Sequence, residues 1–417
     1  MKQVILTIIT NINPDKSNDL EKLLFEIESD LKHNSILKFP AITLLHFACF
    51  VIISGQGSET YLIFENNFDD TIDNYLEQLT QEAGPGLHKI YSCCSDYNEI
   101  NYDKTRLITY LRHAINYPNT YHIGNVGRSA VRIQQECQLR EQVEDYIDIQ
   151  LRIPGNKVSV LPLRNGIQNF ARTNSLFSSI KSVGPRQTFI ERFLPWLHVT
   201  IFLIGLIIFL PVLIPAGTLW VIVLRRVEKA DMASKDLPNV NHLQNLVERE
   251  DKIAQNHIAT ITTVKPGWFR QITLRMVLWV ANLLARTSNK GELSGIPSIH
   301  FAHWALIENG KRLLFFSNYD GSWSSYLDDF IDKASRGLTG IWSNTVGFPK
   351  TRFLILDGAR NEAAFKAYAR ASQLETLVWY SAYPKLTVQI IDKDSLIREN
   401  LYTSLNGEAT TEWLKLF

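Results

Sequence analysis

The stretch FLPWLHVTIFLIGLIIFLPVLIPAGTLWVIVL, residues 193–224, carries no formally charged side chain and separates two parts of the chain that are typical of water-soluble sequence. A helix that crosses the roughly 30 Å hydrocarbon layer of a bilayer needs about 20 residues, so this run is long for one span and short for two. Pro211 and Pro215 interrupt its middle, because proline removes a backbone donor and clashes with the preceding helical turn. We expect this segment to lie in a membrane.

The flanks of the apolar run bear on how it enters the bilayer. Basic residues stand on both sides, Arg192 before it and Arg225 after it, whereas a single span usually has a positive bias on one side only. The pattern favours a re-entrant helical hairpin that turns near Pro211 to Gly217. A single tilted span is the alternative, since its length alone is permissible.

Length and composition limit the rest of the chain. The 417 residues predict two domains plus the apolar insert, each domain large enough to bury its own core. Lysine and arginine (43) balance aspartate and glutamate (42), so the chain lacks the basic excess that a nucleic-acid partner would require. The four cysteines, Cys49, Cys93, Cys94 and Cys137, form no CxxC pair, which disfavours a disulfide framework or a zinc site.

The first half alternates strand and helix patterns. A β-branched run at 4–10 and an amphipathic helix at 17–31 come first. A hairpin at 42–53 and 60–68 follows, and then a helix at 70–83 that Gly84-Pro85-Gly86 is expected to stop. The remaining predicted segments are a helix at 106–115, a strand-like YHIGNV at 121–126 and a charged segment at 132–147.

The same order recurs after the apolar run, which indicates an internal duplication. The matching segments are a strand at 257–264, a helix at 269–286, and a hairpin at 299–307 and 312–319. The matched positions are His46-Phe47-Ala48 with His300-Phe301-Ala302, Asp69 with Asp320, Tyr75-Leu76 with Tyr326-Leu327, Gly86-Leu87 with Gly337-Leu338, and Val131, Ile133 and Leu139 with Val388, Ile390 and Leu396.

The order βαββαβ is the ferredoxin-like arrangement, an antiparallel sheet with helices on one face. We therefore predict an α+β fold in which two tandem ferredoxin-like domains form one intramolecular α/β barrel, with the hydrophobic membrane helical hairpin inserted between them. The predicted parts are a first domain at 1–150, a linker at 151–192, the membrane segment at 193–224, a linker at 225–254 and a second domain at 255–417. The segment 269–286 is apolar almost all round, and we interpret it as a helix buried between the domains, with an interfacial helix as the alternative.

This architecture resembles the duplicated, dimeric α/β-barrel proteins of the dye-decolourising peroxidase and chlorite dismutase type, over residues 1–147 and 255–405. The segment Ser317-Asn318-Tyr319-Asp320-Gly321 resembles the G-x-x-D-G signature of dye-decolourising peroxidases, with Ser317 in place of the first glycine. The resemblance implies that Asp320 lies over a haem and moves peroxide protons. The competing interpretation is that Asp320 caps the helix that begins near Ser322.

Two histidines are candidate haem ligands under the resemblance. His300 and His303 are three apart on a predicted strand, so their side chains are expected to face opposite sides and cannot bind one metal together. The family would supply its proximal histidine from a later position, but this sequence has no histidine after His303. His113 or His122 of the first half would be the substitutes.

Two functions remain open from the sequence. One is a membrane-attached, peroxidase-like oxidoreductase that acts on a lipophilic or membrane-proximal small molecule between the sheets. It would use Asp320 for proton transfer, Arg352 or Arg312 for charge stabilisation, and His300 or His303 for haem ligation or proton relay. The other is a non-enzymatic, membrane-anchored binding or assembly module without a cofactor. In both, the partner is the lipid bilayer, and both soluble domains are expected on its cytoplasmic side.

Overall fold

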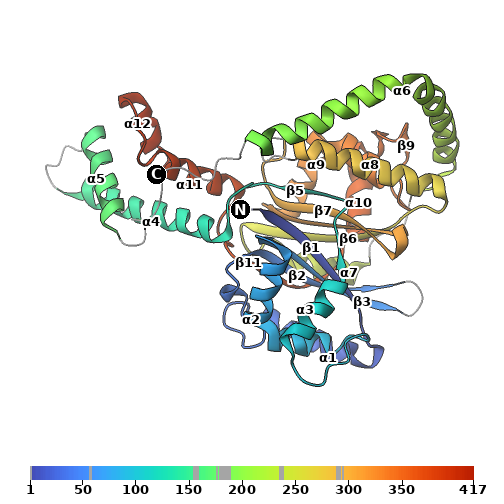
Figure 1. The fold of residues 1–417 in the computed structure, drawn as a ribbon, viewed down its shortest axis with the longest axis horizontal. Coiled ribbons are helices and arrows are strands. Elements are labelled where there is room, and N and C mark those ends of the chain that lie inside the picture. The colour runs from blue at the N-terminus through green and yellow to red at the C-terminus, as the bar shows by residue number, and fades with distance from the viewer. Residues whose placement is uncertain are drawn as a thin grey trace.

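The fold is given by a computed structural model that describes residues 2–55, 59–153, 159–174, 177, 189–233, 239–287, 293 and 295–417. It is a mixed α+β architecture with antiparallel sheets (Figure 1), which confirms the predicted class at that level.

The first half contains most of one sheet and the helices around it. Its elements are β1 (Gln3–Asn11), η1 (Pro14–Lys16), α1 (Ser17–Ser29), η2 (Phe39–Ala41), β2 (Leu45–Ser54), β3 (Thr60–Asp69), α2 (Ile72–Tyr91), α3 (Lys104–His113), β4 (Ile115–Asn116), β5 (Thr120–Ile123), α4 (Ala130–Arg152) and α5 (Val160–Thr173). The long helix α6 (Phe189–Ala230) and the short α7 (Val240–Arg249) follow.

The second half also begins with a strand, a helix and two hairpin strands, and it contains a further small hairpin. Its elements are β6 (Gln255–Thr263), α8 (Trp268–Thr287), β7 (Ile299–Ile307), η3 (Glu308–Gly310), β8 (Arg312–Asp320), α9 (Trp323–Trp342), β9 (Thr351–Arg352), β10 (Leu356–Asp357), η4 (Gly358–Arg360), α10 (Glu362–Ser372), β11 (Thr376–Ser381), α11 (Val388–Asn400) and α12 (Gly407–Leu414).

Two antiparallel sheets form the body, and each borrows a strand from the other half of the chain. The first sheet has the order β11-β2-β3-β1-β4 and the second β5-β7-β8-β6. β5 of the first half pairs with β7, where Tyr121 lies opposite His303. β11 of the second half pairs with β2, where Trp379 lies opposite Cys49. Neither sheet can therefore be completed without the other half.

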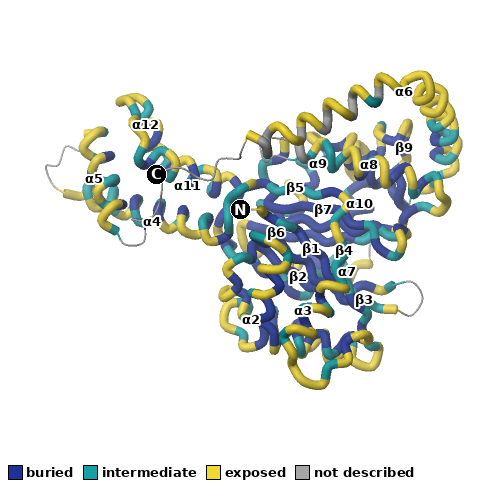
Figure 2. The backbone as a smooth tube through the Cα atoms, viewed as in Figure 1, coloured by how far each residue is buried: buried dark blue, intermediate teal, exposed yellow. Residues whose placement is uncertain are grey.

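The two faces of each sheet separate two outer cores from the space between the sheets. Helices α1, α2 and α3 cover one face of the first sheet, and α8, α9 and α10 cover one face of the second. The opposite faces of the two sheets meet in an apolar layer that includes Cys49, Val51, Ile63, Ala259, Leu314 and Phe316. Figure 2 shows that the strands of both sheets are the most buried part of the molecule.

The prediction that Gly84-Pro85-Gly86 stops a helix is wrong. α2 continues through Pro85 to Tyr91. Gly86 serves packing instead of a helix stop, since a Cβ there would lie 1.8 Å from the Ile36 carbonyl oxygen. The predicted linkers also contain helices, since α4 extends to Arg152, and α5 and α7 lie within them. The other parts of those linkers fall outside the described residues.

The predicted hairpin in the apolar segment is also wrong in its form. α6 is one helix of 42 residues that continues through Pro211 and Pro215. Figure 1 shows that it bends sharply instead of reversing through a loop. A proline within a helix removes one backbone donor and produces a kink while the turns on either side persist. Within the described residues, Ile207–Ala230 is long and apolar enough to cross a membrane.

A lateral arm of helices projects from the body at the end opposite the α6 bend (Figure 1). It consists of α4, α5, α11 and α12, around a core that includes Leu139, Val143, Ile167, Ile397 and Trp413. Ion pairs join α4 to α11: Arg140 Nε lies 2.7 Å from Asp394 Oδ1, and Arg398 Nη1 lies 3.0 Å from Glu136 Oε1.

The sequence interpretation of α8 as a helix buried between the two halves is wrong. Its residues Leu274 and Leu278 pack against the outer face of the second sheet, together with Ala302 and Trp304. On the opposite side of α8, Trp268, Ile272, Met276 and Val280 are exposed.

Candidate functional site

The predicted site residues lie in three separate places. Arg312 is the first residue of β8 and Asp320 the last, so they stand at opposite ends of one strand. Arg312 donates to the Ser54 carbonyl oxygen at 2.6 Å and pairs with Glu308. Arg352 is exposed in the β9–β10 hairpin, where it pairs with Asp357 at 2.5 Å. The two arginines therefore do not join His300 and Asp320 in one site.

His300 and Asp320 do lie together. The imidazole Nε2 of His300 is 2.7 Å from Asp320 Oδ1, at the end of the second sheet. The other carboxylate oxygen, Oδ2, accepts a hydrogen bond of 2.8 Å from the Val388 backbone amide, the first residue of α11. Asp320 thus accepts a hydrogen bond from the first amide of the arm helix α11, whose N-cap is Thr387, and does not cap α9, whose N-cap is Ser322.

The same arrangement occurs in the first sheet. His46 Nε2 lies 3.2 Å from Asp69 Oδ2, and that oxygen accepts a hydrogen bond of 2.9 Å from the Ala130 amide, the first residue of α4. His46 also bonds the Tyr383 hydroxyl at 2.8 Å through Nδ1. Both histidine–aspartate pairs therefore anchor the start of an arm helix, which is a structural task.

A third group of polar residues lies deeper between the sheets. This inter-sheet polar cluster consists of Thr7, Glu65, Asn67, His257, His303 and Asn318, all buried. His303 Nε2 lies 3.1 Å from the Thr7 hydroxyl, and its Nδ1 lies 3.8 Å from Glu65 Oε1.

Hydrogen bonds connect the cluster across the two sheets. Asn67 donates to Glu65, and Asn318 donates to Asn67 Oδ1 at 2.8 Å. Asn318 Oδ1 in turn contacts His257 Nδ1 at 3.0 Å and accepts from the Trp379 indole at 2.8 Å.

The prediction that His300 and His303 face opposite sides is wrong. A β-bulge between Ile299 and Phe301 shifts the alternation by one residue. As a result the ring of His300 lies 5.3 Å from Phe47, and His303 contacts Thr7 and Glu65, so both reach residues of the first sheet.

Burial keeps the titratable members of the cluster neutral. Desolvation raises the pKa of the Glu65 carboxyl to about 8. The hydrogen bond from Asn67 lowers this pKa, but by less than desolvation raises it. Desolvation lowers the pKa of His303 to about 3 and that of His257 to about 4. Glu65 and His303 are therefore a carboxylic acid beside a neutral imidazole, not an ion pair.

The cysteines offer no activated nucleophile. Desolvation raises the pKa of the Cys49 thiol, and it raises the pKa of Cys94 to about 11. A thiolate is the reactive form, so these buried thiols behave as small apolar side chains.

The residues present do not fit a haem. His300 Nε2 is held by Asp320 and by Gln255 at 3.4 Å, and its ring packs among Phe47 and Tyr383. The other nitrogen of His303 points toward Glu65 inside the packed cluster. Neither imidazole opens onto a space for a porphyrin.

The substitute ligands fit no better. His122 is buried on β5 within the sheet. His113 lines an open surface pocket of about 780 Å³, whose charged lining residues are Asp96, Glu99 and Arg106. Among the described residues, no group of three or more His, Cys, Asp or Glu side chains could hold a metal ion.

Sequence reasoning missed Glu65, Asn67, His257 and Asn318. A signal was present, because three consecutive polar residues, Glu65, Asn66 and Asn67, interrupt the largely apolar strand TYLIFENNF, and a strand places such neighbours on both of its faces. His257 sits opposite Asn318 in the matching pair of strands.

Comparisons with known proteins assign this chain to no family. No protein-family model matches the chain, and no curated protein matches it significantly. One solved structure, titled "Crystal structure study of anthrone oxidase-like protein", is 10% identical and has a TM-score of 0.22, over 92% of this chain and 94% of that one. A similarity at this level carries no argument about function.

Proposed function

We propose that this chain is a non-enzymatic, membrane-attached binding or assembly module, in which a duplicated ferredoxin-like barrel holds a helical arm and a membrane helix in fixed positions. The observation that carries the proposal is the use of Asp320: its two oxygens bind His300 and the first amide of α11. The residue with the strongest catalytic resemblance is thus committed to holding the arm.

Recurring contacts support the duplicated barrel. Gln3 and Gln255 each bond two backbone carbonyls ahead of an arm helix, and each pairs in register with Asp69 or Asp320. Tyr75 stacks on Phe68 as Tyr326 stacks on Tyr319, both at 3.8 Å. The helix caps align Ala130 rather than Val131 with Val388, one residue from the match made by sequence.

The arm is the part suited to assembly. α4 and α11 start beside the two histidine–aspartate pairs and are joined by buried charges. Glu136 is 1% exposed and accepts from Arg132, Arg398 and Ser395. Breaking such a buried group costs several kcal/mol, of order 3–5, which favours one fixed arrangement of the two helices.

The reciprocal strand exchange supports attachment from one side. β5 completes the second sheet and β11 the first, so the halves on either side of α6 belong to one body. α6 would then enter and leave the bilayer on the same side, which we propose to be the cytoplasmic side.

The experiment uses full-length protein from haem-supplied cells and measures its haem absorbance, its attachment to membranes and its thermal stability. We expect no Soret band, retention in the membrane after alkaline carbonate washing, and loss of thermal stability in Asp320→Asn and Asp69→Asn alike. The exposed Asp332→Asn of α9 is the control and should change nothing. A Soret band in wild type that His300→Ala removes would overturn the proposal.

One observation favours an enzyme as the second candidate. A protonated carboxyl beside a neutral imidazole, as in Glu65 and His303, is a pair able to exchange a proton. A lipophilic small molecule would reach this pair only if the packed layer between the sheets opens to admit it. Turnover of such a substrate that Glu65→Gln abolishes, with the fold intact, would favour this oxidoreductase-like role over the binding module.

A further inference from the structure

α8 has two apolar faces, although a surface helix needs only one. The inner face packs Thr273, Leu274 and Leu278 into the second half. The outer face carries the α8 stripe, defined as Trp268, Ile272, Met276 and Val280, which are 73%, 48%, 55% and 43% exposed. Spacing of four residues keeps these side chains on one side of the helix. In water, such a continuous apolar row on a helix is unfavourable and marks a contact surface.

The C-terminal limb of α6 is fastened to the start of α8. The Trp220 indole donates to the Thr273 hydroxyl at 3.2 Å, and its ring lies 6.1 Å from Phe269. Leu224, about one helical turn after Trp220, is fully buried at the point where α6 meets the body. Both helices lie on the same side of the molecule (Figure 1).

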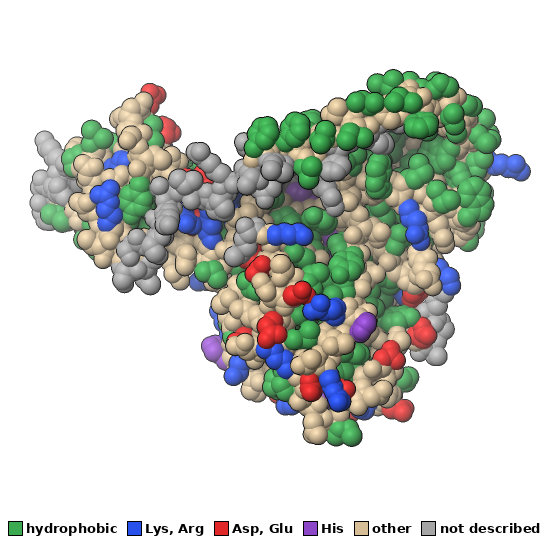
Figure 3. Space-filling model, in the orientation of Figure 1, with side chains coloured by type: hydrophobic (Ala, Val, Ile, Leu, Met, Phe, Trp, Pro, Cys, Tyr) green, Lys and Arg blue, Asp and Glu red, His purple; other side chains and the backbone are tan. Residues whose placement is uncertain are grey.

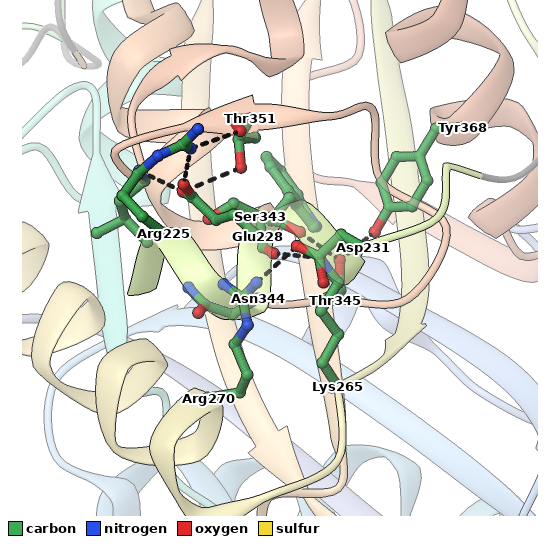
Figure 4. A network of polar contacts seen from close by, with 12 residues as sticks. Arg225, Glu228, Asp231, Lys265, Arg270, Ser343, Asn344, Thr345, Thr351 and Tyr368 are labelled. Atoms are coloured by element: carbon green, nitrogen blue, oxygen red, sulfur yellow. Dashed lines mark hydrogen bonds and ion pairs between the residues drawn. The ribbon is translucent and has the colours of Figure 1, made fainter. Parts of the chain in front are cut away.

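A polar network then fixes the last turns of α6, as Figure 4 shows. Glu228 accepts from the Phe353 and Leu354 amides at 3.1 and 2.7 Å. Asp231 pairs with Lys265 at 2.7 Å and Arg270 at 2.6 Å, on the approach to α8 and in its first turn. Because these bonds tie α6 to the body over several turns, α8 cannot move independently of the membrane helix.

We propose that the α8 stripe is a second membrane-contact surface, which lies in the headgroup and acyl boundary of the bilayer beside α6. This rests on the proposed membrane attachment and adds that the second half is seated on the lipid surface. The occupant is lipid rather than protein because the stripe adjoins α6, whose side chains at Ile207, Ile208 and Phe209 are 60% exposed or more. Hydrophobic side chains gather over α6 and continue on the surface below it (Figure 3).

The residue types at the edge of the stripe suit an interface. Trp268 stands at the first position of α8, and tryptophan is enriched at the level of the headgroups. Arg226 and Lys229 are exposed on the last turns of α6, where they can meet anionic headgroups. Lys265 and Arg270 both pair with Asp231 and are half-buried and buried, so they take no part.

The proposal also limits the lipid-embedded part of α6. Trp220 contacts α8, and the helix from Leu224 onward packs on protein. The residues that enter hydrocarbon therefore precede Trp220, although the apolar and length criteria alone extend the candidate span to Ala230.

The test uses full-length protein in vesicles of equimolar phosphatidylcholine and phosphatidylglycerol. All labelled variants carry Cys137→Ser, because Cys137 is the one free cysteine that is not buried. An environment-sensitive fluorophore is then attached at Met276→Cys on the stripe, at Ile208→Cys on α6, or at Glu21→Cys. Glu21 is exposed on α1, at the far end of the molecule from α6 (Figure 1).

Quenching by nitroxide-labelled lipid reports contact with the acyl chains. We expect about twofold or greater quenching at Met276 and Ile208, and none at Glu21, since an interfacial helix buries its apolar face in the boundary region. Quenching at Ile208 without quenching at Met276 would overturn this inference and leave membrane attachment intact. Absence of quenching at all three positions would overturn the proposed attachment as well.

Discussion

At the level of single residues, the corresponding positions of the two halves were readable from the sequence, but their partners were not. The match of His46 with His300 and of Asp69 with Asp320 names residues that do contact each other in two similar pairs. Their task depends on the arm helices, whose first amides come from residues 130 and 388, far along the chain. A local motif cannot reveal a partner that only the tertiary fold brings near. Asp320 was therefore assigned to the wrong helix.

The buried carboxyl of Glu65 should make stability depend on pH. Its pKa is raised from 4.5 to about 8 in the folded chain, so the folded state retains a proton that the unfolded state releases. The contribution of Glu65 to stability should fall as pH rises from about 4.5 to 8, by about 1.4 kcal/mol per pH unit. Comparison with Glu65→Gln isolates it, because the buried His257 and His303 are present in both proteins and act in the opposite direction below pH 6.5. Glu65→Gln cannot release a proton, so its stability relative to wild type should increase through this window.

Chemical unfolding of detergent-solubilised protein at several pH values measures this difference. Glu21→Gln, at an exposed position on α1, should keep the pH profile of the wild type. Parallel profiles for wild type and Glu65→Gln would mean that Glu65 is charged and paired in the folded chain.

At the level of elements, the strands were predicted better than the helices. Apolar runs on either side of polar turn residues located the hairpins β2–β3 and β7–β8, since strands buried on both faces are apolar almost throughout. Helix ends were predicted from Gly and Pro, and these signals failed in α2 and α6. In α2 the glycine serves close packing against Ile36. Propensity is a weak guide where packing decides.

The attachment of α6 to the body should depend on Glu228. This buried carboxylate bonds the amides of Phe353 and Leu354, which have positive φ values of 51° and 69° and need a fixed partner. Glu228→Ala leaves those amides and Arg225 without their acceptor. We expect a loss of about 3 kcal/mol in stability and faster hydrogen exchange at residues 351–357.

Lys229→Ala is the matched control, since Lys229 is the next residue along α6 and is exposed. Hydrogen-exchange mass spectrometry of the reconstituted protein distinguishes the two variants. Unchanged exchange at 351–357 in Glu228→Ala would mean that the turn holds its shape without α6.

At the level of the whole molecule, an antiparallel α+β architecture was predictable, and the exchange of strands was not. The segment 121–126 was identified as a strand, yet nothing in its pattern indicates that it pairs with residues 299–307 rather than with its own half. Pairing depends on the path of the chain between elements. The arm was invisible for the same reason, because its helices come from four separate segments that share one core.

The strand exchange constrains membrane topology, and a labelling experiment can test it. β5, from before α6, completes the second sheet, and β11, from after α6, completes the first. The residues before and after α6 must therefore lie on the same side of the bilayer. We place cysteines at Thr173 on α5 and Val240 on α7, both exposed, in the Cys137→Ser background. Both should react with a membrane-impermeant maleimide in inverted vesicles and neither in right-side-out vesicles, whereas Ile208→Cys in α6 should be protected in both.

Reaction from opposite faces would require α6 to cross the bilayer once. That result cannot coexist with two sheets that share strands within one chain, so it would refute the arrangement of the body together with the same-side attachment.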